Sequence, residues 1–209
     1  MKKKQNILIV RNNPRNLEVS NLHNLEIFFT NELKKHHNIK VHDLYDENFF
    51  PRIDREFLAF ILQPRLDGPS HLVKKYEKKI QIAKDFAKAD TIIIVSPYWT
   101  GLFPSALKDW FDLLPVENIT IKINPNGKSQ SGISSNKKAI ILQTQGDTKS
   151  RNTINNSGFT WIQDVLNYYG VENKRCRHLL ATSSYTKKFN SRIVKGQIIN
   201  TIKDFINND

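Results

Sequence analysis

Residues 91–112 read TIIIVSPYWTGLFPSALKDWFD, and this stretch decides the fold. Ile92 to Val95 form a continuous apolar run without alternation, which is typical of a parallel strand covered on both faces. Ser96-Pro97 is expected to end the strand. Pro104 suits the first turn of a helix, where the backbone N–H has no helical partner. The stretch therefore predicts a buried strand, an aromatic loop and a helix.

The aromatic loop consists of Pro97, Tyr98, Trp99, Thr100 and Gly101, just past the carboxyl end of the strand. Open α/β sheets bind their ligands at this edge. The two large rings offer a platform for a flat ligand, and Gly101 allows a close backbone approach or a positive φ. The alternative is an ordinary strand-to-helix loop whose aromatic side chains pack on the core.

The rest of the chain alternates between strands and helices, without a repeat or a linker. Five strands separated by helices predict a doubly wound parallel sheet with helices on both faces. The order 2-1-3-4-5 is favoured, because the loops with candidate ligand residues then follow three neighbouring strands around a switch point. Strands are expected at 7–10, 39–44, 92–95, 138–144 and 176–182, and helices from Ser20 or Asn21 to His36, after Pro104, and at 71–89, 159–169 and 191–206.

Two segments depart from this alternation. Residues 119–136 are expected to be an insertion, since alternating isoleucines precede an Asn-Pro-Asn-Gly turn. Residues 45–70 are irregular, and a loop of this length in a compact domain is usually functional. At 209 residues the chain suits one domain rather than two, so we expect a single domain over residues 1–209.

The chain is strongly basic, with a net charge of +12. Residues 173–203 contain eight Lys and Arg and neither Asp nor Glu. Such a surface either aids solubility or attracts polyanions, namely nucleotide phosphates, nucleic acid or an anionic membrane. We expect no nucleic-acid partner, because no recognition motif for nucleic acid accompanies the charge. The eight basic residues are Lys174, Arg175, Arg177, Lys187, Lys188, Arg192, Lys195 and Lys203.

The location and redox chemistry follow from what the sequence lacks. No apolar run approaches the roughly 18 residues that a transmembrane helix needs, and the basic start has no signal-peptide pattern, so we expect a cytoplasmic protein. Cys176 is the single cysteine and cannot form an internal disulfide. Its neighbours Arg175 and Arg177 favour the thiolate, although a half-buried strand position is the simpler interpretation. His36-His37, at a helix end, is expected to be solvated, and the histidines show no metal spacing.

Two more loops meet the same edge of the predicted sheet. Residues 11–21 connect the first strand to a helix, whose N-terminal N–H groups and dipole favour a phosphate. Ser20 is a plausible N-cap there, and the absence of glycine excludes a Walker loop. The fourth strand ends in Thr144-Gln145-Gly146-Asp147. We therefore expect these two loops and the aromatic loop to converge on one ligand.

The combination resembles the flavodoxin-like NAD(P)H:quinone oxidoreductases and the FMN-dependent NADH-azoreductases. Leu107, Lys108, Trp110, Phe111 and Asp112 match the family's Leu-Lys-x-aromatic-Phe-Asp helix. The aromatic loop, a basic pair that opens the fourth strand, and the run from Val41 to Tyr45 are similar too, so the resemblance covers nearly the whole chain. It implies the flavodoxin-like five-stranded fold for residues 1–209.

The resemblance also implies a flavin site. In the family the first loop holds the FMN phosphate, the second lines the isoalloxazine ring and the third borders its pyrimidine side. Asn13 stands where the family usually has Ser or His, and Asp147 replaces its second glycine. The implied cofactor-binding residues are Asn13, Ser20, Asn21, Pro97, Tyr98, Trp99, Thr100, Gly101, Thr144, Gln145, Gly146 and Asp147.

By resemblance, the protein is an FMN-dependent NAD(P)H oxidoreductase that reduces quinones, azo compounds or nitroaromatics by ping-pong hydride transfer. No catalytic side chain or metal is expected, because the flavin carries the chemistry. NADH or NADPH is the reductant, and FAD is the alternative cofactor. The family implies a homodimer. The alternative functions are a flavodoxin-type electron carrier, which is typically acidic, and an ancillary subunit that docks on a membrane transporter through the basic surface.

Overall fold

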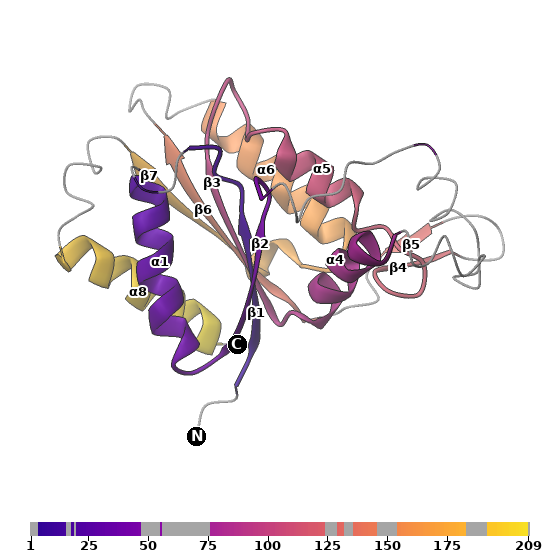
Figure 1. The fold of residues 1–209 in the computed structure, drawn as a ribbon, viewed down its shortest axis with the longest axis horizontal. Coiled ribbons are helices and arrows are strands. Elements are labelled where there is room, and N and C mark those ends of the chain that lie inside the picture. The colour runs from indigo at the N-terminus through magenta and orange to yellow at the C-terminus, as the bar shows by residue number, and fades with distance from the viewer. Residues whose placement is uncertain are drawn as a thin grey trace.

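The computed structural model describes residues 4–15, 18, 20–46, 55, 76–123, 129–131, 136–145, 154–182 and 192–208. Its centre is a sheet of five parallel strands (Figure 1). The order β2-β1-β3-β6-β7 confirms the predicted order 2-1-3-4-5, since β6 and β7 are the fourth and fifth strands of this sheet. The strands are β1 (Asn6–Arg11), β2 (Asn38–Asp43), β3 (Thr91–Pro97), β6 (Lys138–Gln145) and β7 (Cys176–Thr182).

Helices cover both faces of the sheet, as predicted (Figure 1). One face packs against α1 (Asn21–Lys34) and α8 (Arg192–Asn207). The other packs against α4 (Glu77–Lys88), α5 (Ala106–Asp112) and α6 (Ile154–Tyr168), and a short 3-10 turn, η2 (Asn173–Arg175), leads into β7.

The central strand β3 divides its side chains between the two cores. Ile92 and Ile94 pack with α4, α5 and α6, whereas Ile93 and Val95 pack with α1 and α8. All four are inaccessible to solvent. Successive side chains of a strand point to opposite faces, so a strand covered on both sides needs apolar residues throughout. This arrangement accounts for the unbroken run in the sequence.

Several element ends are as predicted. Ser20 is the N-cap of α1, and its Oγ accepts a hydrogen bond from the backbone N–H of His23 at 3.3 Å. Gly170 follows α6 with a φ of 89°, the left-handed conformation that glycine adopts readily after a helix. The insertion forms a separate antiparallel pair, β4 (Ile121–Ile123) with β5 (Ser129–Ser131). Its expected turn and most of residues 45–70 lie outside the described residues.

Other ends differ from the prediction. β3 continues through Pro97, because pairing with β6 extends to Thr144 and needs no N–H from the proline. Pro104 lies before Ser105, the N-cap of α5, and not within the helix. The Pro104 carbonyl accepts from the N–H of Leu107 at 3.1 Å, so the proline belongs to the turn that leads into α5. α6 begins at Ile154, five residues before the predicted start at Phe159.

The basic pair Lys137-Lys138 joins both helical layers to the sheet. Lys137 Nζ donates to the carbonyls of Ala87 and Ala89 at the end of α4. Lys138 Nζ donates to carbonyls at the end of α8, on the opposite face. Helix C-termini carry unsatisfied carbonyls and partial negative charge, so each ammonium stabilises one helix end.

His37 and Cys176 show how burial changes the expected chemistry. His37 is buried rather than solvated, and its Nδ1 accepts the N–H of Gln5 at 3.3 Å. Burial lowers the pKa of its ring. Cys176 is half-buried in β7 as the simpler interpretation predicts, and burial raises the pKa of its thiol to about 11. The adjacent arginines do not activate it. Among the helices that the structure describes, none combines the length and apolar character needed to span a bilayer.

Candidate functional site

The three predicted loops meet around one cavity. It has a volume of about 370 Å³ and lies at the carboxyl ends of β1, β3 and β6. This is the switch point of the sheet, where open α/β folds bind ligands. Eight of the twelve predicted residues line it, together with Arg15 and Leu22, which the sequence prediction missed: Asn13, Ser20, Asn21, Pro97, Tyr98, Trp99, Thr144 and Gln145.

One wall of the cavity is the N-terminus of α1. Asn13 Nδ2 donates to Ser20 Oγ at 2.8 Å, and Asn13 Oδ1 accepts the backbone N–H of Arg15 at 3.3 Å. Asn13 therefore braces the loop against the helix cap. The first amides of α1 and the side chain of Arg15 supply positive potential at this wall, which suits an anion such as a phosphate. A cation in a loop that enters a helix was the available sequence signal for Arg15.

The charged groups beneath this wall are already paired. Arg11 donates to both carboxylate oxygens of buried Glu26 at 2.7 Å and to Asp43 at 2.8 Å. Burial by itself would lower the pKa of Arg11, but Glu26 and Asp43 more than offset this and raise it. Arg11 thus holds α1 and β2 to β1, and Arg15 is the cation that lines the cavity.

The opposite wall is the aromatic loop, which closes in a tight turn. Trp99 and Leu102 exchange both backbone hydrogen bonds, at 2.7 and 2.9 Å. Between them Thr100 and Gly101 have φ values of 49° and 82°, as a type I′ turn requires. These two predicted residues shape the turn and do not line the cavity. An added Cβ at Gly101 would meet nothing within 4 Å, so the positive φ is what favours glycine there.

Packing from behind holds the aromatic loop in place. The Tyr98 hydroxyl donates to the Gly101 carbonyl at 2.5 Å, and the Tyr98 ring meets Phe103 edge-on at 6.0 Å. Gly158 of α6 faces both rings, and a Cβ there would lie 3.1 Å from each. The sequence prediction missed Gly158, although a glycine within a helix is a signal of close packing.

Hydrogen bonds join the three strand ends below the cavity. Asn12 Nδ2 donates to Ser96 Oγ at 2.8 Å, which links β1 to β3. The backbone N–H of Tyr98 donates to the Thr144 carbonyl at 2.7 Å, which links β3 to β6. The loops therefore start from a common rigid edge. Gly146 and Asp147, the last two predicted residues, lie outside the described part of the chain.

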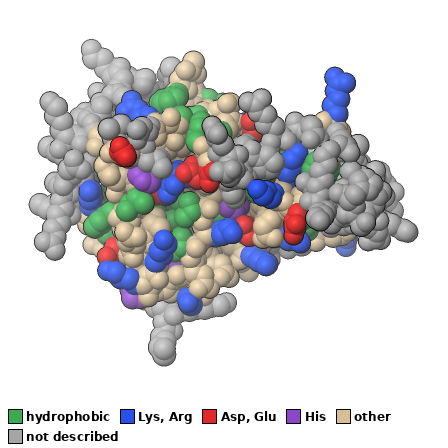
Figure 2. All heavy atoms as spheres, viewed as in Figure 1, with side chains coloured by type: hydrophobic (Ala, Val, Ile, Leu, Met, Phe, Trp, Pro, Cys, Tyr) green, Lys and Arg blue, Asp and Glu red, His purple; other side chains and the backbone are tan. Residues whose placement is uncertain are grey.

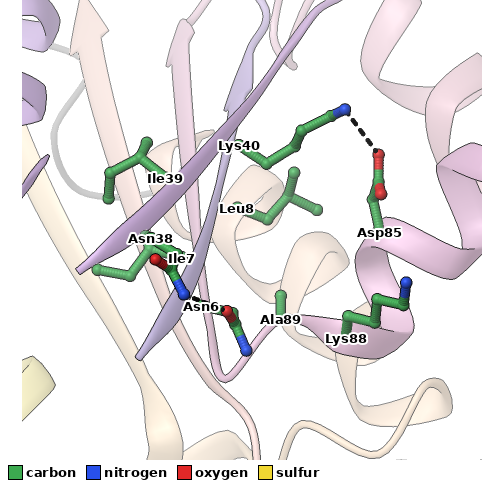
Figure 3. Close-up of a pocket in the computed structure, with 9 residues that line it drawn as sticks. All are labelled: Asn6, Ile7, Leu8, Asn38, Ile39, Lys40, Asp85, Lys88 and Ala89. Atoms are coloured by element: carbon green, nitrogen blue, oxygen red, sulfur yellow. Dashed lines mark hydrogen bonds and ion pairs between the residues drawn. The ribbon is translucent and has the colours of Figure 1, made fainter. Parts of the chain in front are cut away.

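A second cavity, of about 290 Å³, lies at the amino ends of β1 and β2 beside α4 (Figure 3). Three of its polar side chains, Asn38, Lys40 and Asp85, have partners within the protein. Asn38 Nδ2 donates to Asn6 Oδ1 at 3.0 Å, and Lys40 Nζ lies 3.6 Å from Asp85. Asp85 also bonds the buried His42 Nε2 at 3.0 Å. The helical residues that line this second cavity belong to the C-terminal end of α4, and none of its lining residues begins a helix. The second cavity is therefore the weaker candidate for an anionic ligand.

Three of the basic residues late in the sequence lie away from the first cavity. Lys174, Arg175 and Arg177 line a third cavity, of about 400 Å³, at the amino end of β7. Lys187 and Lys188 lie outside the described residues. On the face drawn in Figure 2, Lys and Arg side chains are scattered among Asp and Glu and do not gather into one patch. The structure thus supports a dispersed basic surface there.

The fold and site define a flavodoxin-like protein with a ligand cavity at its switch point. A family model described as a flavodoxin-like fold matches residues 5–195. The FMN-dependent NADH:quinone oxidoreductase of Coprothermobacter proteolyticus is 31% identical over 171 residues, covering 79% of this chain and 81% of that protein. A Clostridium perfringens protein of the same name is 29% identical over 169 residues, covering 79% and 81%.

A solved structure has the same fold. The FMN-dependent NADH-azoreductase from Bacillus anthracis, determined in complex with FMN, matches with a TM-score of 0.71 at 18% identity, covering 96% of this chain and 99% of that one. The chain belongs to the flavodoxin-like family of FMN-dependent NADH:quinone oxidoreductases and azoreductases. Members of this family are flavin-dependent oxidoreductases, so membership favours an enzyme over an electron carrier.

Proposed function

We propose that the protein binds FMN in the cavity at the carboxyl ends of β1, β3 and β6, and uses it to pass electrons from NADH or NADPH to quinones, azo compounds or nitroaromatics. One observation carries this proposal. A single cavity has the positive N-terminus of α1 on one side and the rings of Tyr98 and Trp99 on the other. FMN joins a phosphate to a flat ring, and the names of the relatives point to FMN and NADH.

Each wall has a role in this proposal. The amides at the start of α1, with Ser20 and Arg15, hold the phosphate. Trp99 and Tyr98 contact the ring, and Thr144 and Gln145 bond its polar edge. One helix N-terminus suits the single phosphate of FMN better than the pyrophosphate of FAD. When bound, FMN supplies the two-electron chemistry, and the protein supplies position and electrostatics.

The rim of the cavity bears on the substrates. Trp99, which lines the cavity, is 43% exposed, and Leu102, its partner across the turn, is 39% exposed. An apolar rim suits a flat nicotinamide and, after it leaves, a flat acceptor, which is the order of a ping-pong reaction. We further propose one domain over residues 1–209, a cytoplasmic location and a homodimer in which the partner covers part of this rim.

Titration calorimetry of the flavin-free protein tests the cofactor. FMN is expected to bind one to one at micromolar concentration, with FAD weaker. Trp99→Ala should weaken FMN binding, whereas Tyr168→Ala removes an exposed ring at the far end of α6 and should not. If neither flavin binds the wild-type protein, the proposal is wrong.

Initial-rate kinetics test the reaction. Varying NADH at several quinone concentrations should give parallel double-reciprocal lines, because the two substrates use one cavity in turn. Intersecting lines would contradict the ping-pong order but not the cofactor. A protein that binds FMN yet oxidises neither NADH nor NADPH with any quinone, azo dye or nitroaromatic would instead be a carrier or a regulatory subunit.

A further inference from the structure

Three side chains form a hydrogen-bonded chain that ends at the cavity. His178 Nε2 on β7 lies 3.0 Å from Gln143 Oε1 on β6. Gln143 Nε2 donates to Gln145 Oε1 at 3.3 Å. Gln145 lines the cavity, whereas His178 and Gln143 stand behind it. We call these three residues the amide relay.

The amide relay is held rigidly. Gln143 is fully buried and Gln145 is 7% exposed, so their amides must find partners within the protein. The His178 ring stacks on Phe159 of α6, with centroids 4.7 Å apart and planes inclined by only 9°. This stack fixes the ring plane and directs Nε2 at Gln143. The relay therefore links the outer strand and α6 to one wall of the cavity.

The direction of the hydrogen bonds follows from donor chemistry. An amide oxygen only accepts, so His178 Nε2 carries the proton in the arrangement that the structure has. Gln143 then donates onward, and the oxygen of Gln145 is occupied by that bond. Because its oxygen accepts this bond from Gln143, we infer that Gln145 meets a ligand in the cavity with its N–H₂ group. Reversing every bond would need an unprotonated Nε2 and would turn the Gln145 oxygen toward the cavity.

We propose that His178 and Gln143 are positioning residues that fix Gln145 as a hydrogen-bond donor to the polar edge of the bound flavin. The inference rests on the proposed function, because it needs FMN in this cavity. Reduction adds negative charge to the flavin, and a fixed donor stabilises charge that develops beside it. The relay thus makes the protein bind reduced FMN more tightly relative to oxidised FMN.

Nuclear magnetic resonance of the flavin-free protein tests the direction of the relay. Burial lowers the pKa of His178, so its ring is neutral near pH 7 and the question concerns only the tautomer. The ring ¹⁵N shifts of His178 should report a proton on Nε2. A proton on Nδ1 alone would overturn the assignment, because Gln145 would then present its oxygen. This measurement needs no bound flavin.

Flavin binding tests the consequence. His178→Phe keeps a ring on Phe159 and removes the donor, and Gln143→Met removes the middle link at similar volume. Each should reduce the preference for reduced over oxidised FMN about fivefold to tenfold, which lies within the range of one ordinary hydrogen bond. The preference is measured as the midpoint potential of bound FMN against free FMN. Arg177→Gln, which changes the neighbour whose guanidinium packs on Phe205 of α8, should leave it unchanged.

A double variant separates positioning from general damage. If His178 acts through Gln145, adding His178→Phe to Gln145→Ala should lower the preference no further. Additive losses would overturn the relay, as would an unchanged potential in both His178→Phe and Gln143→Met. Failure of the wild-type protein to bind FMN would refute the proposed function itself. Wild-type binding with an unchanged potential in the variants would refute the relay alone.

Discussion

The two edges of the sheet are both polar and both hollowed, yet they differ in what their polar groups do. At the amino edge, the ammonium groups of Lys137 and Lys138 donate hydrogen bonds to the carbonyls that end α4 and α8. At the carboxyl edge, Asn13 bonds Ser20, the N-cap of α1, and the first residues of α1 line the cavity. Every helix of a parallel α/β unit runs back against its strands, so helix C-termini gather at one edge and N-termini at the other.

The difference teaches where an anion can bind. At the amino edge, the lysines donate to the carbonyls that end the helices, so their role is structural. The basic character of this edge therefore does not by itself mark a ligand site. The carboxyl edge has the N-terminus of α1 and its positive potential, which favour a phosphate. Basic residues that are already paired, Lys137 and Lys138 at the amino edge and Arg11 beneath the cavity, should therefore govern stability. The residues that line the carboxyl cavity should govern flavin binding.

The largest expected effect comes from Arg11 at the carboxyl edge. Arg11→Ala leaves the carboxylate of Glu26 buried without its partner, and breaking such a pair costs about 3–5 kcal/mol of unfolding free energy. Arg15→Ala, the matched control, should leave stability unchanged within about 0.5 kcal/mol but weaken FMN binding. Chemical denaturation and calorimetry measure the two quantities. Equal stability of the two variants would contradict the assigned roles.

Lys137 at the amino edge gives a pH-dependent effect. Burial lowers its pKa from 10.5 to about 8, so between these values the unfolded chain holds a proton that the folded protein has released. The unfolding free energy of the wild type should therefore rise from pH 8 to pH 10.5, by roughly 2–4 kcal/mol from this group. Lys137→Met removes the group and its slope. FMN affinity at fixed pH should not change in the variant.

If the unfolding free energies of the wild type and of Lys137→Met change with pH in parallel, Lys137 is not the source of the slope. A loss of FMN affinity in Lys137→Met would show that the two edges are coupled.

Gly101 tests the turn at the carboxyl edge. A valine at φ 82° is strained by about 1–3 kcal/mol, so Gly101→Val should loosen the turn and weaken FMN binding, since Tyr98 bonds the Gly101 carbonyl. Gly101→Asn, which tolerates this φ, should retain most of the affinity. Thr100→Gly relieves strain in the same turn and should not lower stability. A fully folded Gly101→Val protein with wild-type FMN affinity would argue against the turn as a binding element.

The smallest expected effect separates two helical glycines. Gly158→Ala places a methyl 3.1 Å from the Tyr98 and Phe103 rings, so it should shift the aromatic loop and weaken FMN binding a few-fold. Gly196→Ala in α8 meets nothing within 4 Å, and should raise stability by about 0.5–1 kcal/mol without affecting FMN. Thermal melts and FMN titrations of both variants make the comparison. Identical behaviour would mean that α6 does not support the loop.

The sequence determined the architecture and the neighbourhood of the site. Local signals indicated most of it: the run Ile92–Val95 marked a strand covered on both faces, Ser20 marked a helix start, and the alternation of strands and helices marked a parallel sheet. The order 2-1-3-4-5 brings the three candidate loops to one edge, and the resemblance to the family indicated which of their residues meet the ligand.

Only the tertiary structure decided which side chains act together. Asn12 meets Ser96 across 84 residues because strand register brings them level. His178 meets Gln143 across 35 residues and diagonally, because the neighbouring strands pair His178 with Ile141. The burial of His37 and the close packing at Gly158 likewise depend on neighbours distant in the chain. Local sequence carries the preference of each segment for helix or strand, whereas hydrogen-bond partners and contact distances are set by how complete elements pack.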